Sequence, residues 1–76
     1  MNKDQRTKIE NIKERLQQLA QEVEALADEE QGKYDNLNEG MQAMERFQKL
    51  EENADTLYTA QESIEEAINT IEELEL

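Results

Sequence analysis

Apolar residues recur at alternating intervals of three and four along most of the chain, and this spacing is the strongest constraint on its fold. The first row consists of Ile9, Ile12, Leu16, Leu19, Val23 and Leu26. The second row consists of Phe47, Leu50, Ala54, Leu57, Gln61, Ile64, Ile68 and Ile71, with Gln61 as its one polar member. Residues spaced in this way share one face of an α-helix and occupy the a and d positions of a coiled-coil heptad. The pattern therefore predicts two amphipathic helices.

We predict the first helix over residues 3–31 and the second over residues 38–75. Both stretches are rich in good helix formers, and the chain contains no proline. Residues 32–40 hold both glycines and form the tip that connects the helices. Because a short connection makes consecutive helices antiparallel neighbours, the fold class is all-α, with residues 1–76 forming one antiparallel, coiled-coil-like helical hairpin.

The tip residues suggest how each helix is terminated. Gly32 is predicted to end the first helix in a left-handed conformation, and Asn36 with Glu39 to form a capping box for the second. Antiparallel pairing of the two rows then sets a register. The expected pairs are Leu19 with Leu57, Ile12 with Ile64, Lys13 with Glu65, and Ala20 with Tyr58. This register also places the basic start of the first helix beside the acidic end of the second.

Two helices bury little surface, and for small scaffolds the gain from apolar burial nearly cancels the entropy cost of ordering the chain. Small or apolar residues flank the two rows at e and g positions. These predicted self-association residues are Ala20, Ala27, Ala60, Ala67 and Leu74. We expect a homodimer that forms a four-helix bundle; the alternative is a marginal monomer that folds fully only on its partner.

Composition excludes several classes of function. The 76 residues include 20 acidic and 8 basic ones, a formal charge of -12, and neither histidine nor cysteine. Nucleic acids and anionic membranes are polyanions, so we expect no direct binding to either. The absence of imidazole and thiol groups removes the commonest catalysts and zinc ligands, and neighbouring glutamates on a hairpin have no cleft to shift their pKa. We expect no enzyme activity, catalytic residue, cofactor or bound metal.

Negative charge is concentrated toward the tip. The acidic band consists of Glu22, Glu24, Asp28, Glu29, Glu30, Glu51, Glu52 and Asp55. In the expected register these carboxylates are level with one another, at a linear charge density close to that of duplex DNA. The band is either the solvated surface of a coiled coil or a DNA mimic that binds a protein partner with a basic surface.

A second candidate surface lies at the tip itself. The tip cluster consists of Tyr34, Leu37, Met41, Met44 and Phe47. It either closes the open end of the bundle or forms a partner-binding knob, because methionine and aromatic side chains adapt well to protein partners.

The tip sequence Tyr34-Asp35-Asn36-Leu37-Asn38-Glu39-Gly40-Met41-Gln42 is followed by Glu45-Arg46 and an acidic helix. It resembles the pattern Phe/Tyr-Asp-Asn-x-Pro-Glu-Gly/Ser-x-Gln of small uncharacterised acidic helical-hairpin proteins of phages and prophages. Asn38 stands where that pattern usually has proline. The resemblance implies a phage or prophage origin but carries over no activity. The start of the chain lacks the apolar core of a signal peptide, and no apolar run is long enough to span a membrane. We therefore expect a location in the cytoplasm of a bacterial host cell.

Two hypotheses of function follow. In the first, the chain is a counter-defence inhibitor whose acidic band occupies a basic, nucleic-acid-binding surface of a host protein. Tyr34, Leu37 and Phe47 would then anchor it. In the alternative, the chain is a structural or assembly module whose oligomer is the functional unit. The sequence does not identify the partner or separate these two hypotheses.

Overall fold

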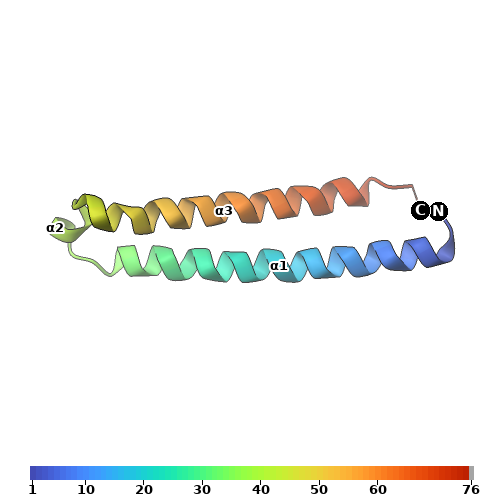
Figure 1. The fold of residues 1–76 in the computed structure, drawn as a ribbon, viewed down its shortest axis with the longest axis horizontal. Coiled ribbons are helices and arrows are strands. Elements are labelled where there is room, and N and C mark those ends of the chain that lie inside the picture. Colours follow the sequence, from blue (N-terminus) through green and yellow to red (C-terminus); the bar gives the residue numbers. More distant parts are fainter. Residues whose placement is uncertain (76) are drawn as a thin grey trace.

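The computed structural model describes residues 1–75 and contains a helical hairpin. Its elements are α1 (Lys3–Asp35), α2 (Glu39–Gln42) and α3 (Glu45–Glu72). α1 and α3 lie side by side and antiparallel, while α2 forms the tip at one end and the N- and C-termini lie at the other (Figure 1). The rod measures 59 × 15 × 13 Å. The predicted all-helical class and the hairpin are therefore confirmed.

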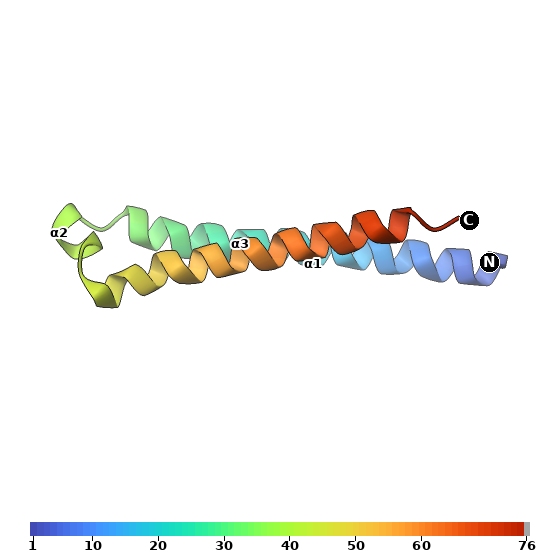
Figure 2. The same cartoon turned by 90° about the horizontal axis from the view of Figure 1, so that it is seen from above.

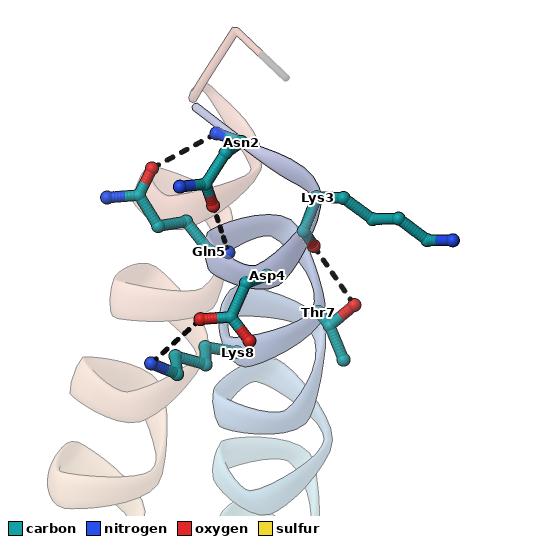
Figure 3. Close-up of polar contacts among 6 residues, drawn as sticks. All are labelled: Asn2, Lys3, Asp4, Gln5, Thr7 and Lys8. Carbon is teal, nitrogen blue, oxygen red and sulfur yellow. Dashed lines mark hydrogen bonds and ion pairs between the residues drawn. The ribbon is translucent and has the colours of Figure 1, made fainter.

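α1 begins with a complete capping box (Figure 3). The Asn2 side chain accepts a hydrogen bond from the Gln5 backbone N–H at 2.8 Å, and the Gln5 side chain accepts one from the Asn2 backbone N–H at 3.1 Å. Asp4 pairs with Lys8 at 3.0 Å in the same turn. The box satisfies N–H groups that have no partner within the helix, and the carboxylate of Asp4 complements the helix dipole. These contacts fix where α1 starts.

The connection differs from its prediction. α1 continues through Gly32 to Asp35, and no residue among those described has a positive φ. Side-chain contacts one turn apart stabilise this last stretch, such as the hydrogen bond from Gln31 to Asp35 at 3.0 Å. A glycine ends a helix only where the chain takes up the left-handed conformation, and here local contacts keep Gly32 helical.

The predicted capping box at the tip is also wrong. Asn36 is the C-cap of α1, and the N-cap role falls to Asn38, whose side chain accepts a hydrogen bond from the Met41 backbone N–H at 2.9 Å. Asn38 thereby opens the single turn of α2. Because that turn occupies residues 39–42, α3 begins at Glu45 rather than at residue 38.

The register of the hairpin is displaced by one heptad, about 10 Å along the axis, from the prediction. Lys13 pairs with Glu72 rather than with Glu65. Ala20 shares a hollow with Glu65 and does not face Tyr58. The displacement also separates the two other expected pairs, Leu19 with Leu57 and Ile12 with Ile64. It follows from the later start of α3, which shifts α3 along α1.

α1 is rotated about its own axis compared with the prediction. Its least exposed residues follow the a and e positions and are Ile9, Lys13, Leu16, Ala20, Val23 and Ala27. The predicted d-position contacts Ile12, Leu19 and Leu26 are instead 40%, 49% and 52% exposed. Alanines at e positions allow close approach of the two helix axes, so the helix that presents them gains contact on both sides of the a row. The two helices run beside each other with a slight crossing (Figure 2).

α3 keeps its predicted inward face. Ala54 and Ile68, both at a positions, are 0% and 7% exposed, and the d residues of α3 are half-buried. The buried hydrophobic residues of the described chain are Ala54, Ile68, Ala20 and Ala27. The core is therefore a single narrow line between two helices, and most large apolar side chains keep part of their surface exposed.

Candidate functional site

The two long sides of the hairpin differ in chemistry. We call the side that carries Lys13 the polar side. The Lys13 Nζ atom lies 3.7 Å from Oε1 of Glu72 and 3.8 Å from Oε1 of Glu10, and the Lys13 side chain is only 21% exposed. Further toward the tip, Gln61 donates a hydrogen bond to Glu24 at 2.8 Å. Ion pairs as exposed as these contribute at most about 1 kcal/mol each. Of the contacts named here, Lys13–Glu72 and Gln61–Glu24 join α1 to α3, and they align the two helices more than they stabilise the fold.

Tyr58 has the most perturbed ionisation on the polar side. Its hydroxyl donates a hydrogen bond to the Asp28 carboxylate. That hydrogen bond, followed by burial and by the negative charges of Asp28 and Glu24, raises the pKa of Tyr58 from 10.0 to about 12. The folded state therefore favours the neutral hydroxyl, which is the form that can donate.

This raised pKa predicts a loss of stability at high pH. The contribution of the Tyr58 contact is fully present below pH 10 and is lost as the pH rises from 10.0 to about 12, because the unfolded chain ionises first. We expect Tyr34→Phe, which leaves Tyr58 as the one tyrosine, to show a tyrosinate absorbance midpoint well above 10.0. Asp28→Asn in the same background should bring that midpoint down. A midpoint that Asp28→Asn does not move would contradict the assignment.

The structure distributes the acidic band over different parts of the surface. Glu30 pairs with Lys33 at 2.7 Å, and Glu51 lies near enough to Tyr34, at the tip end, for its negative charge to raise the pKa of that tyrosine. With the contacts of Glu24 and Asp28 described above, half of the band is engaged within the hairpin. The other members, Glu22, Glu29, Glu52 and Asp55, are exposed. Because the register is displaced, the eight carboxylates are not level, and the expected DNA-like density is not reached on one side.

An open hollow of about 290 Å³ lies between the helices on the polar side. Its lining residues are Gln17, Ala20, Gln21, Glu24, Glu65 and Ile68. The hollow offers carboxylate and amide groups around a small apolar floor. Among residues 1–75, no group of three or more potential ligand side chains is arranged to hold a metal ion.

The tip cluster is organised by Tyr34. The Tyr34 hydroxyl donates to the Gln42 carbonyl at 3.5 Å, and the Gln42 side-chain amide donates to the Tyr34 carbonyl at 3.1 Å. Burial, followed by the charge and hydrogen bond of Glu51, raises the pKa of Tyr34. Arg46 lies over the ring of Phe47, with its guanidinium carbon 4.7 Å from the ring centroid. The two hydrogen bonds between Tyr34 and Gln42 fasten α2 to the end of α1.

The members of the tip cluster are exposed to different degrees. Met44, the N-cap of α3, is 43% exposed. The half-buried members are Tyr34, Leu37, Met41 and Phe47. Four of the five members of the cluster are therefore partly covered, and a role of the cluster as a cap stays a prediction. Its binding of a partner stays a prediction.

The side opposite the polar side carries exposed apolar residues. In an antiparallel pair the e positions of both helices border one side and the g positions border the other. The e-position pair Lys13–Glu72 marks the polar side, so the d row of α1 and the g row of α3 lie together on the opposite side. This apolar face consists of Ile12, Leu19, Leu26, Ala60 and Ala67. Leu74, which follows the end of α3, is 43% exposed.

This arrangement corrects part of the predicted self-association set. Ala20 and Ala27 are 5% and 0% exposed because they pack against α3 within the hairpin, and they have no surface to offer a second copy. Ala60, Ala67 and Leu74 remain accessible. Sequence reasoning missed the exposed d row of α1. The available signal was the recurrence of alanine at e positions, which makes the apolar stripe of α1 wider than one contact row.

Among the described residues, none of the helices has both the length and the apolar character needed to cross a membrane. Comparisons with protein-family models, with curated proteins and with solved structures return no match to this chain.

Proposed function

We propose that this chain is an interaction protein that works by binding another protein chain through the apolar face. The observation that supports the proposal is the exposure of Ile12, Leu19 and Leu26, at 40%, 49% and 52%, in one straight row on α1. Contiguous apolar surface of this kind marks interaction sites on small proteins. Side chains at seven-residue intervals present a ridge that a partner helix can accommodate in its grooves.

The energetics favour occupation of this face. Burying a leucine or isoleucine side chain completely contributes about 1.5–3 kcal/mol, and roughly half of that gain remains unused at each of these three positions. A partner that covers all three gains several kcal/mol before the cost of association is subtracted.

Site-specific photo-crosslinking in cells that express the chain tests this proposal. A photoreactive phenylalanine derivative at Leu19 is expected to crosslink to a protein chain, whether a copy of this protein or a different one. The same group at Gln21, which is exposed on the polar-side surface of α1, is the matched control. Equal crosslinking from both positions, or none from Leu19, would contradict a role for the apolar face.

A second candidate function rests on charge. The chain carries a net charge of -12, and the exposed members of the acidic band remain accessible on a narrow rod. Such a surface attracts a basic protein at long range and accelerates its association. This supports the counter-defence proposal, in which the chain occupies a basic, nucleic-acid-binding surface of a host protein. Binding of that protein should weaken steeply with added salt, whereas contact through the apolar face should not.

The two candidates assign the contact to different surfaces. If the oligomer is the functional unit, as an assembly module requires, substitutions on the apolar face should abolish function. Charge reversal at Glu29 or Asp55 should then have no effect. The inhibitor proposal requires the opposite pattern.

A further inference from the structure

We infer that the partner of the apolar face is a second copy of this chain, and that the two hairpins associate with their tips at the same end. α1 of each copy then lies over α3 of the other. This inference rests on the proposed function and deepens it by naming the partner and the register.

The register within the hairpin places the apolar face in matched levels. The contacts Lys13–Glu72, Glu24–Gln61 and Asp28–Tyr58 define which residues of α1 and α3 lie level along the rod. By that register, the level pairs on the apolar face are Leu26 with Ala60 and Leu19 with Ala67. The face therefore has a row of large side chains on α1 and, at both of these levels, a small side chain beside it on α3.

A surface with one raised row and one low row can complement a copy of itself. A two-fold axis along the rod places Leu19 of one copy over Ala67 of the other, and Leu26 over Ala60. The opposite orientation, with tips at opposite ends, places Leu19 against Leu19 and Ala67 against Ala67. That arrangement overpacks one helix pair and leaves a gap in the other, and both defects weaken an interface. A two-fold dimer requires a self-complementary patch, and the tips-together arrangement supplies one in which large side chains meet small ones.

The α3 residues that border the apolar face can be covered without losing hydrogen bonds. The Ser63 hydroxyl donates to the Thr59 carbonyl at 3.1 Å, and the Thr70 hydroxyl donates to the Glu66 carbonyl at 3.0 Å. Thr56, one heptad before Ser63 in the same row, makes the same contact with the Glu52 carbonyl at 3.0 Å. Burying a polar group is costly when its partner is lost, and these hydroxyls already have partners in their own helix.

Charge complements the same orientation. With tips together, the start of α1 lies over the end of α3 in the other copy. Lys8 and Arg15 occupy g positions of α1, next to the exposed d row, and Glu66 occupies an f position on the outer side of α3. Opposite charges at the rim of an interface fix its orientation more than its affinity. An unrelated partner would have to supply this pattern of size and charge, whereas a second copy carries it already.

Two single-cysteine chains test the inference, because the protein has no cysteine of its own. Leu19→Cys and Ala67→Cys chains are mixed in equal amounts, oxidised under mild conditions and analysed by intact mass. The expected main product is the mixed disulfide between the two different chains, because Leu19 lies over Ala67 of the other copy. A Gln21→Cys chain is the control and should crosslink only at the background rate.

Each other outcome overturns the inference in a recognisable way. Disulfides formed mainly between identical chains would show the opposite orientation and refute the stated pairing. A lack of crosslinks, with light scattering that reports a monomer at all concentrations, would show that a second copy is not the partner. In that case a crosslink from Leu19 to a different protein in cells would still support the proposed function, so the two failures are distinguishable.

Discussion

Replacing Ile68 with alanine is expected to lower the free energy of unfolding by about 2 kcal/mol or more, the lower part of the range for such core truncations. Ile68 is 7% exposed and is the one large side chain among the buried hydrophobic residues of the described chain. A core that is one line of side chains wide has no second layer to compensate for the loss. The free energy of unfolding of a typical small domain is itself small, so this substitution removes a large share of it. Urea unfolding followed by circular dichroism measures it.

Ile12→Ala is the matched control for this substitution. Both variants replace an isoleucine with an alanine inside a helix, so the gain in helix propensity is the same in each and drops out of the comparison. The two positions differ in burial, because Ile12 is 40% exposed. We expect its effect on the isolated hairpin to be less than half that of Ile68→Ala. The comparison is made at high dilution, because a second copy would cover Ile12. Equal destabilisation by the two changes under those conditions would contradict the observed rotation of α1.

Replacing Ala27 with leucine is expected to destabilise the hairpin by about 1–3 kcal/mol, the usual cost of overpacking. Ala27 is 0% exposed and lies at the contact between α1 and α3. A leucine side chain there must push the two helices apart or rotate α1, and either response disrupts contacts along the rod. The measurement is the urea midpoint at constant slope.

Ala25→Leu provides the control, two residues away in the same helix. Ala25 is exposed, so the added side chain meets no neighbouring helix and the expected change lies within about 0.5 kcal/mol. If Ala27→Leu were tolerated as well as Ala25→Leu, the e positions of α1 would not form the close contact. In the a/d arrangement predicted from the sequence, Ala27 would flank the contact and both substitutions would be tolerated.

Heptad spacing was sufficient to predict that two long helices form and pair. Ile9, Leu16 and Val23 in α1, and Ala54 and Ile68 in α3, all lie toward the helix–helix contact, as their a positions predicted. Spacing defines the rotation of a helix about its own axis only approximately, because side chains at a, d and e positions all fall on neighbouring parts of the helix surface. It cannot decide which pair of rows faces the partner.

Three features of the connection differ from the prediction, and the third follows from the other two. Local contacts kept Gly32 helical, Asn38 rather than Asn36 capped the tip helix, and the register of α3 moved by one heptad as a result. Each alternative had acceptable local chemistry, so propensity alone could not choose between them. The acidic band depended on that register and was dispersed when it changed.

The helical class, the antiparallel pairing and the acidic character of this protein are therefore determined by the sequence. Each depends on the periodicity or the charge of residues along the chain, which can be read without knowing how the helices pack. The exposed row on α1 was decided only when the helices packed. Alanines at positions 20 and 27 allowed a closer approach than leucines at positions 19 and 26, and α1 turned to present them to α3. That rotation is a compromise between shapes on two helices, which no pattern along one helix contains.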